Sequence, residues 1–453
     1  MITRKKILLI SANRLSVPYP VYPIGLSYIS AYLQEKLPGF DIELFDLNLK
    51  TSVELKSLLL NSRPDYIGVS FRNADDMNSE SSTSLINEYQ KLISLIRQNS
   101  GALIIIGGSA FSIFPEVFFT RLNPDFGISG EGEHSMYKLI DSLEQNKDYK
   151  QVEGLVYAEN NRVKINPKSC INNDTLRLSY HDEMTDFYWE KSGTMNIQTK
   201  RGCPKRCIYC TYPLIEGNKT RTIEVGQIIE DLSFFYFKKH INYFFITDSV
   251  FNVDEEYNCQ LAEKMISKGI KIKWGAYFTP QGLNRETLML YKKAGLRHIE
   301  FGTESLSNVQ LKNYGKSFSV DDVLISSELC NEAGIYFAHF LILCGYGETE
   351  TTLDETFSNS ARMKNSIIFP YIGMRIYPGT ILHKLAIKEK KLSPEQDLLF
   401  PVYYVSDQVD IESINERAKK TGQKWVFESS DYSELLNKMR ANHKKGPLWH
   451  LIR

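Results

Sequence analysis

The chain has 453 residues, 42% of them hydrophobic, which is enough for two to three domains with a large core. Lysine and arginine number 54, as do aspartate and glutamate, so the formal net charge is zero. This balance argues against broad binding to nucleic-acid phosphates, and no nucleic-acid partner is expected. No apolar run has membrane-spanning length, and the apolar start at 1–11 is too short for a signal peptide. We expect a cytoplasmic protein, in which clustered cysteines serve metal binding or catalysis.

The first part of the chain, 1–145, alternates short apolar segments with helical patterns. We predict strands at 6–10, 42–46, 66–71, 103–108 and 126–130, and helices at 22–33, 52–60, 81–98 and 133–144. This order is typical of a doubly wound, Rossmann-like α/β domain, in which ligands bind beyond the carboxyl ends of the strands. Small or polar residues fall at two of those ends: Gly107, Gly108, Ser109, Gly130, Glu131 and Gly132. Glycine permits close backbone approach to a bulky ligand, although ordinary strand-to-helix turns also explain it.

The second part of the chain, 194–390, repeats a strand–helix unit six times. We predict strands at 195–198, 243–248, 271–277, 298–302, 336–343 and 372–376, and helices at 225–239, 254–268, 285–294, 320–333 and 352–363. This pattern predicts a partial (β/α)6 barrel with function at the carboxyl ends of its strands. Residues 146–193 are expected to be a linker with a small hairpin at 154–157 and 163–165. Residues 391–453 are expected to form a short C-terminal α/β cap, with an amphipathic helix near 431–442.

Three of the seven cysteines share one loop after the first barrel strand. Cys203, Cys207 and Cys210 have the spacing Cys-x3-Cys-x2-Cys, and Gly202 and Pro204 break the strand before them. Cysteine thiolates are the usual ligands of iron–sulfur clusters, normally four to a cluster, so three would leave one iron open. A zinc knuckle is the alternative, but it needs a fourth Cys or His nearby, and none lies between 210 and 240.

With aromatic Tyr209 just before the last cysteine, this triplet resembles the signature of the radical S-adenosylmethionine (SAM) superfamily. The resemblance implies a [4Fe–4S] cluster whose open iron chelates SAM. It also implies reductive cleavage of SAM to a 5′-deoxyadenosyl radical, fed by an external one-electron reductant of the flavodoxin or ferredoxin type.

The same resemblance implies SAM contacts at the ends of several barrel strands. Where the family often has Gly-Gly-Glu, this chain has Asp248 and Ser249 after Thr247. A Gly-x-Glu-Ser segment, a glycine-rich turn and a barrel-closing segment complete the set, which is Tyr209, Asp248, Ser249, Glu304, Ser305, Gly345, Gly347 and Arg375. The alternatives are a solvated helix start for Glu304 and Ser305 and a structural salt bridge for Arg375. His339 and Cys344 are expected to be packed core residues.

The glycine-rich strand ends of 1–145, together with Pro23-Ile24-Gly25-Leu26, resemble the cobalamin-binding domain of cobalamin-dependent radical SAM enzymes. The family string Asp-x-His-x-x-Gly, whose His ligates cobalt, is missing here. Arg72 directly follows the third strand, and we expect it beneath the corrin, where a cation keeps cobalt without a lower ligand. The alternative is a structural ion pair of Arg72 with Asp75 or Asp76.

Taken together, the resemblances imply a cobalamin-dependent radical SAM methyltransferase that acts on an unactivated carbon of a small-molecule or natural-product substrate. One alternative is a radical SAM dehydratase, cyclase or rearranging enzyme with the same layout, either with or without cobalamin. Another is a redox sensor or electron carrier, which needs only a cluster and its surroundings.

Overall fold

The computed structural model describes residues 4–16, 19–76, 83–171, 173, 176–427, 437–439, 441 and 446. The chain divides into two compact units. Unit 1 consists of Met1–Met77, Ser82–Lys191 and Leu214–Gly217, and unit 2 of Asn78–Ser81, Ser192–Pro213 and Asn218–Arg453. Among the helices in the described ranges, none is both long and apolar enough to cross a membrane.

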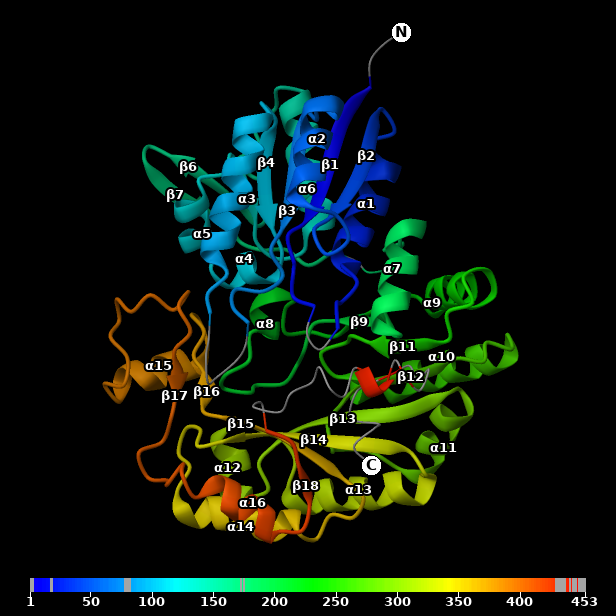
Figure 1. Cartoon of the computed structure of the whole chain (residues 1–453), viewed down its shortest axis with the longest axis vertical. Coiled ribbons are helices and arrows are strands. Elements are labelled where there is room, and N and C mark those ends of the chain that lie inside the picture. The colour runs from blue at the N-terminus through cyan, green and yellow to red at the C-terminus, as the bar shows by residue number, and fades with distance from the viewer. Residues whose placement is uncertain are drawn as a thin grey trace. The chain divides into compact units, whose positions relative to one another are not determined.

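Unit 1 is built on a seven-stranded sheet with the order β2-β1-β3-β4-β5-β6-β7 (Figure 1). Its strands are β1 (Lys5–Ser11), β2 (Phe40–Asp46), β3 (Tyr66–Ser70), β4 (Leu103–Gly107), β5 (Phe126–Ile128), β6 (Leu155–Glu159) and β7 (Arg162–Ile165). The first five are parallel. The chain winds outward in both directions from β1, so the strand order reverses between β1 and β3. In doubly wound sheets the ligand binds at the carboxyl ends beside such a reversal.

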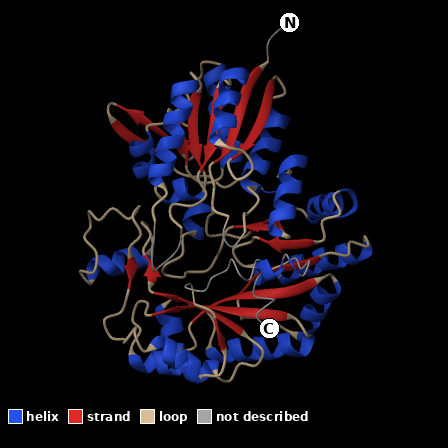
Figure 2. Ribbon diagram, in the orientation of Figure 1, coloured by secondary structure: helices blue, strands red, loops and turns tan. Residues whose placement is uncertain are grey.

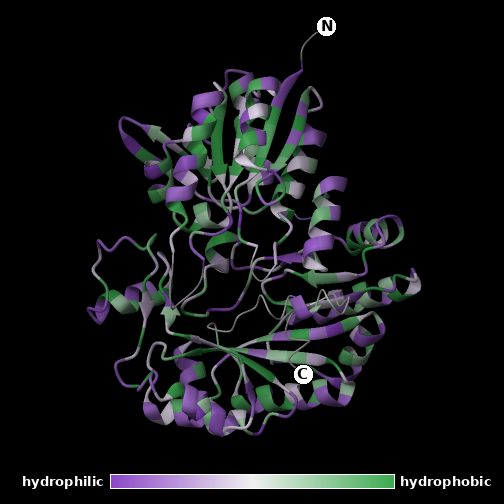
Figure 3. Cartoon of the chain, in the orientation of Figure 1, coloured by the Kyte–Doolittle hydropathy of each residue, from purple (hydrophilic) through white to green (hydrophobic). Residues whose placement is uncertain are grey.

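Helices pack on the sheet of unit 1 and bury its apolar strands. The helices are α1 (Ile24–Lys36), α2 (Ser52–Ser62), α3 (Ile86–Asn99), α4 (Ser109–Ile113), α5 (Pro115–Leu122), α6 (Gly132–Glu144) and α7 (Asp182–Ser192). A capping box at Thr51 and Glu54 starts α2. On one face, Leu9 and Ile105 of the strands pack against Leu33 of α1 and Leu139 of α6. The strands accordingly stand out as the apolar part of the unit in Figure 3.

The predicted doubly wound fold and the predicted hairpin are confirmed. The hairpin, however, extends the main sheet, because β6 pairs antiparallel with β5. The stretch 146–191, expected to be a linker, therefore belongs to unit 1 as a compact body. Helices α4, α5 and α7 were not predicted.

Unit 2 is built on a second seven-stranded sheet, in which every strand is parallel to its neighbours. Its order is β18-β15-β14-β13-β12-β11-β8. The strands are β8 (Met195–Ile197), β11 (Tyr243–Ile246), β12 (Lys273–Phe278), β13 (Leu296–Glu304), β14 (Tyr336–Leu343), β15 (Ile367–Ile372) and β18 (Lys424–Trp425). Two antiparallel ribbons add β9 (Lys200–Arg201) with β10 (Arg221–Thr222), and β16 (Met374–Arg375) with β17 (Tyr403–Tyr404).

The long helices of unit 2 gather on one face of this sheet, as Figure 2 shows. The helical elements are α8 (Tyr212–Ile215), whose last two residues belong to unit 1, α9 (Val225–Ser233) with a π-helical extension (Phe234–Lys238), a 3₁₀ turn (Phe251–Val253), α10 (Glu255–Ser267), α11 (Arg285–Lys293), α12 (Asn308–Asn313), α13 (Val320–Ala333), α14 (Glu350–Ser360), α15 (Ile381–Lys388) and α16 (Ile414–Lys420). Capping boxes start α13 and α14. Leu341 and Ile368 of the strands pack against Val323 and Leu353 of these two helices.

The partial barrel is confirmed, but its sixth strand was misplaced. The prediction put it near 372–376, whereas β15 ends at Ile372. Gly373 has a φ of +75°, which breaks the strand, and the next two residues pair with β17. In the C-terminal part, β18 adds an unpredicted strand beside β15. Most of the helix expected near 431–442 lies outside the described residues.

Candidate active site

The cysteine loop of unit 2 is held at its base and at its middle. At its base, β9 pairs with β10. At its middle, the backbone N–H of Ile208 donates to the carbonyl of Tyr314 (3.1 Å), and the Ile208 carbonyl accepts from the N–H of Leu382 (2.8 Å). Gly315 has a φ of +74°, and a Cβ there would lie 2.5 Å from the Arg206 carbonyl oxygen. Elements far apart in the sequence therefore fix the loop that carries the three thiols.

All three cysteines of the loop are free thiols, with Cys203 buried and Cys207 and Cys210 half-buried. Burial raises the pKa of Cys203, and it raises the pKa of Cys210 to about 12, while Lys316 acts in the opposite direction on both. Across the described ranges, no three His, Cys, Asp or Glu side chains are grouped as ligands of one metal ion. In a [4Fe–4S] cluster each thiolate binds a different iron, so this donor set suits such a cluster.

A largely buried ion pair lies beside the loop. The Tyr209 hydroxyl donates to Glu304 Oε1, and Lys316 Nζ lies 3.0 Å from Glu304 Oε2. Lys316 also donates to the Gly302 carbonyl (3.2 Å), and its Nζ lies 5.6 Å from the centre of the Tyr209 ring. Burial disfavours the charged form of Lys316, but Glu304 and the thiol of Cys207 outweigh it and raise the pKa of Lys316. The structure thus brings Tyr209 and Glu304 together, as two of the expected SAM residues.

Sequence reasoning missed Lys316. It lies in the turn after α12, twelve positions beyond Glu304, and no motif marks it. Glu304 reaches it because the backbone there leaves the regular strand: Glu304 has a φ of +59°, at a shift in the pairing of β13 with β14.

Asp248, expected to contact SAM, lies under the start of the cysteine loop. Its side chain is 1% exposed, and its oxygens accept from the backbone N–H groups of Thr199 (2.7 Å) and Lys200 (2.9 Å), from the Thr199 hydroxyl, and from Lys200 Nζ (3.1 Å). A carboxylate has about four lone-pair sites, so protein donors satisfy it. A contact of Asp248 with SAM stays a prediction without support from this geometry. Neighbouring Ser249 is half-buried, and its SAM contact also stays a prediction.

Three further residues expected to bind SAM have packing roles in the structure. Ser305 is buried, with its hydroxyl 3.2 Å from that of Thr356 in α14. A Cβ on Gly345 would lie 2.2 Å from the Tyr314 hydroxyl, and Gly347 has a φ of +75°. These contacts explain the residue types without a ligand, and their SAM contacts stay predictions.

Arg375 is bound by backbone carbonyls. Its guanidinium donates to Ile376 (2.7 Å) and Leu398 (2.8 Å), and it lies 4.7 Å from the centre of the Tyr377 ring. The side chain is buried and joins β16 to the C-terminal segment. This arrangement agrees with the structural alternative stated for Arg375, although the partners named here are backbone carbonyls rather than a salt-bridge carboxylate.

His339 is a satisfied core residue, as expected. Its ring nitrogens lie 2.7 Å from the Thr303 hydroxyl and 3.1 Å from the Ser327 hydroxyl, and burial lowers its pKa to about 3. Cys344 is also buried, as expected.

In unit 1, four expected cobalamin residues lie at the ends of β3 and β4. Gly108 has a φ of +97°, and a Cβ there would lie 2.5 Å from the Phe71 carbonyl oxygen, while Gly107 ends the strand. The Ser109 hydroxyl donates to the carbonyl of Arg72 (2.9 Å), which joins the ends of β3 and β4. The Arg72 side chain is exposed. Within the described ranges, it forms no ion pair with Asp75 or Asp76.

The end of β5 holds the other expected cobalamin residues. Gly130 has a φ of +97°, and its N–H donates to the Ser112 hydroxyl (2.8 Å). Glu131 is mostly buried and accepts from the N–H of Ile171 (2.9 Å), and Gly132 begins α6. The exposed Arg72 and these glycine turns share the carboxyl edge of one sheet, next to the reversal of strand order. This backbone arrangement suits a large planar cofactor.

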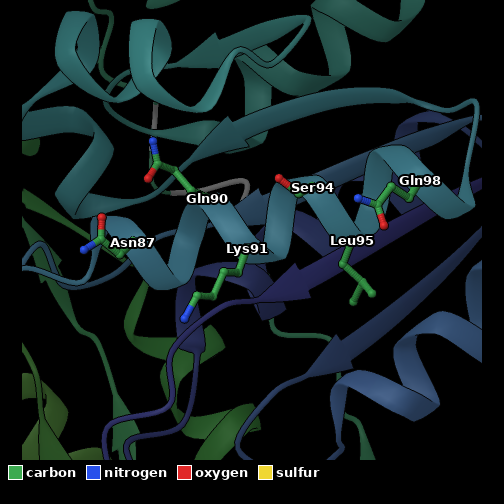
Figure 4. A pocket seen from close by; sticks show the side chains of 6 residues that line it. All are labelled: Asn87, Gln90, Lys91, Ser94, Leu95 and Gln98. Carbon is green, nitrogen blue, oxygen red and sulfur yellow. The ribbon is translucent and has the colours of Figure 1, made fainter.

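A shallow hollow on unit 1 lies elsewhere. Figure 4 shows its lining on one helix, α3, with the residues Asn87, Gln90, Lys91, Ser94, Leu95 and Gln98. It contains none of the expected site residues, and its exposed polar side chains indicate an ordinary helix surface.

Comparison with known families supports the expected assignment of both parts of the chain. Residues 10–140 match the B12 binding domain model, and residues 197–358 match the radical SAM superfamily model. The chain is similar to an uncharacterized methyltransferase of Pyrococcus horikoshii, with 22% identity over 81% of this chain and 80% of the relative. It is also similar to the anaerobic magnesium-protoporphyrin IX monomethyl ester cyclase of Cereibacter sphaeroides, with 24% identity over 56% of this chain and 44% of the relative.

A solved structure shares the fold over nearly the whole chain. The radical SAM methyltransferase TsrM from Kitasatospora setae, with cobalamin and a [4Fe–4S] cluster bound, gives a TM-score of 0.89 at 17% identity, over 99% of this chain and 97% of that one. The two domain matches and this shared fold confirm the resemblance. The chain is thus an enzyme of the radical SAM superfamily, in the subgroup that carries a cobalamin-binding domain, and its cofactors are a [4Fe–4S] cluster, SAM and cobalamin.

Proposed function

We propose that this enzyme is a cobalamin-dependent methyltransferase that acts on an unactivated carbon of a small-molecule substrate. The observation that carries the proposal is the pairing, in one chain, of a cobalamin-binding domain with a three-cysteine radical SAM loop. The methyltransferase names of two similar proteins support methyl transfer over other outcomes. An external one-electron reductant of the flavodoxin or ferredoxin type belongs to the proposal.

In unit 2, Cys203, Cys207 and Cys210 would hold the cluster. Tyr209 and Glu304, with Lys316 beside them, would meet SAM next to it. When bound, the cluster and SAM supply a 5′-deoxyadenosyl radical, and cobalamin supplies the methyl group. The protein's part is to hold these groups in place and to keep water from them. The largely buried Glu304–Lys316 pair presents fixed charge with little solvent reorganisation.

In unit 1, the carboxyl edge of the sheet would hold cobalamin. The turns at Gly107–Ser109 and Gly130–Gly132 would let the backbone approach it. Arg72 would lie below the corrin and disfavour a lower ligand to cobalt. Its guanidinium is available for this role because it forms no ion pair within the described part of the chain.

Anaerobic purification tests the proposal. The expected result is a corrinoid absorption spectrum, a reducible cluster, and both S-adenosylhomocysteine and 5′-deoxyadenosine in turnover with substrate. A triple Cys203→Ala, Cys207→Ala, Cys210→Ala variant should lack the cluster and both products. A protein that never binds corrinoid, or that cleaves SAM without forming S-adenosylhomocysteine, contradicts methyl transfer.

A second candidate is a cyclase, dehydratase or rearranging enzyme of the same layout. The similarity to a magnesium-protoporphyrin cyclase supports this second candidate. The same experiment separates the two, because such an enzyme forms 5′-deoxyadenosine without S-adenosylhomocysteine. A cluster that cycles without SAM cleavage would instead indicate an electron carrier.

A further inference from the structure

One fully buried cation lies at the entrance to the cysteine loop. Lys200 is 1% exposed and lies three positions before Cys203. Its ammonium donates to Thr199 Oγ1 (2.9 Å), Asp248 Oδ2 (3.1 Å) and Asn258 Oδ1 (2.7 Å). These three acceptors use all three N–H groups of the ammonium. Its Nζ also lies 4.4 Å from the centre of the Phe251 ring.

The partner carboxylate fastens the same stretch of backbone. Asp248 Oδ1 accepts from the N–H groups of both Thr199 and Lys200, while Oδ2 faces the ammonium. Asn258 in α10 is fixed in turn, because its amide donates to the Phe251 carbonyl (2.8 Å). Asp248, just after β11, and Asn258 of α10 therefore hold Thr199 and Lys200, the two residues from which the cysteine loop departs.

General energetics argue against stability as the reason for this pair. Removing two charges from water costs several kcal/mol per ion, and well-packed apolar residues often serve the fold equally well. A buried, fully hydrogen-bonded pair does, however, admit a single backbone arrangement. In this chain, that arrangement sets the direction in which the backbone leaves Lys200 toward Cys203.

We propose that Lys200, Asp248 and Asn258 are positioning residues that set the geometry of the cluster-binding loop. They touch neither the cluster nor SAM in this role; they act through the backbone of Thr199 and Lys200. The proposal rests on the proposed function only in assigning the cluster to Cys203, Cys207 and Cys210.

The test compares anaerobically reconstituted full-length protein with the variants Lys200→Met, Asp248→Asn, the double Lys200→Met/Asp248→Asn, and Asn258→Ala. The readouts are iron and sulfide per chain, the rate of iron loss to a chelator, and the electron paramagnetic resonance spectrum of the reduced cluster with and without SAM. Each is recorded at a temperature at which circular dichroism shows a folded chain. Arg417→Met is the matched control, because Arg417 on α16 pairs with Glu350 (2.7 Å) and Asp354, both on α14, away from the cysteine loop.

Each single charge variant should lose iron about 10- to 100-fold faster than wild type, the usual effect of removing a group that supports metal ligands. Its spectrum should also change shape. The double variant should regain much of the retention, because an asparagine oxygen can still accept from the two loop amides. Arg417→Met should melt earlier yet keep the wild-type cluster, which separates positioning from general stability.

Folded single variants with wild-type iron retention and spectrum overturn the proposal. Should both charge variants fail to fold, Asn258→Ala decides, since it removes one acceptor without leaving a charge unpaired: wild-type retention there also overturns it. A wild-type protein that takes up no cluster refutes the proposed function instead, so the two failures are distinguishable.

Discussion

At the scale of single residues, Arg72 offers a direct test of the cobalamin assignment. Its side chain is exposed and forms no ion pair in the described ranges, so Arg72→Ala should change the free energy of unfolding by less than about 0.5 kcal/mol. Cobalamin binding should nevertheless weaken and its visible spectrum shift, as measured by equilibrium dialysis and absorption. Lys91→Ala, on the exposed face of α3, is the control. A variant with wild-type affinity and spectrum would remove Arg72 from the site.

Glu348 gives a pH dependence. It is fully buried after β14, and burial raises its pKa to about 7 from 4.5, against the opposing backbone N–H of Cys344. Between pH 4.5 and 7 the folded state therefore binds more protons than the unfolded state, and stability falls as pH rises through this range. The loss approaches about 3 kcal/mol above pH 7, at 1.36 kcal/mol per pKa unit.

Glu348→Gln should abolish this loss because an amide does not ionise. Urea unfolding at pH 5 and pH 8 measures it, with Glu416→Gln on the exposed surface of α16 as the control. Equal pH dependence in wild type and Glu348→Gln would show that Glu348 does not titrate in this range.

Sequence alone identified residues whose chemistry depends on local spacing. The three cysteines share one short loop, so their pattern is visible without a fold. Lys316 was missed because only the turn after α12 brings it to Glu304. Asp248 has the residue type of a ligand, but sequence could not show that the amides of Thr199 and Lys200 already occupy its oxygens.

At the scale of elements, the turn from β4 to α4 depends on glycine. Gly108→Ala would place a Cβ 2.5 Å from the Phe71 carbonyl oxygen at a φ of +97°, so we expect a loss of about 1–3 kcal/mol or more. Gly25→Ala in α1 is the matched control, because no atom outside its chain neighbours and its own helix backbone lies within 4 Å of the added Cβ. It should be neutral or stabilise by up to about 1 kcal/mol. Thermal unfolding of both variants measures the difference, and equal melting points would contradict the strain.

Elements with strong periodicity were predictable, and those defined by tertiary pairing were not. Strands such as β4 and β14 are mostly apolar runs, which sequence marks clearly. The two-residue strand β18 is a strand only because it pairs with β15. The sixth barrel strand was placed too late because Met374 and Arg375 are also extended, but in a separate ribbon.

At the scale of the whole molecule, each unit has its own sheet and helices. Calorimetry of the cluster-loaded protein should therefore show two transitions. Removal of the cluster should lower only the transition of unit 2, because all three cysteines belong to it. The shift should be about 2–4 °C for each kcal/mol of lost stabilisation. A cluster-dependent shift in both transitions, or one shared transition, would show that the units unfold together.

The order in which the units are completed follows from Leu214–Gly217, which belongs to unit 1 although it lies beyond the cysteine loop. Lys168 Nζ donates to the Leu214 carbonyl (2.8 Å) and to that of Ser112 (3.0 Å). During synthesis, a chain grown only to residue 191 still lacks residues 214–217 of unit 1. The loop with the three thiols must therefore leave the ribosome before unit 1 is complete. Cutting the gene between the two matched domains would therefore separate residues 214–217 from the rest of unit 1, to which they belong.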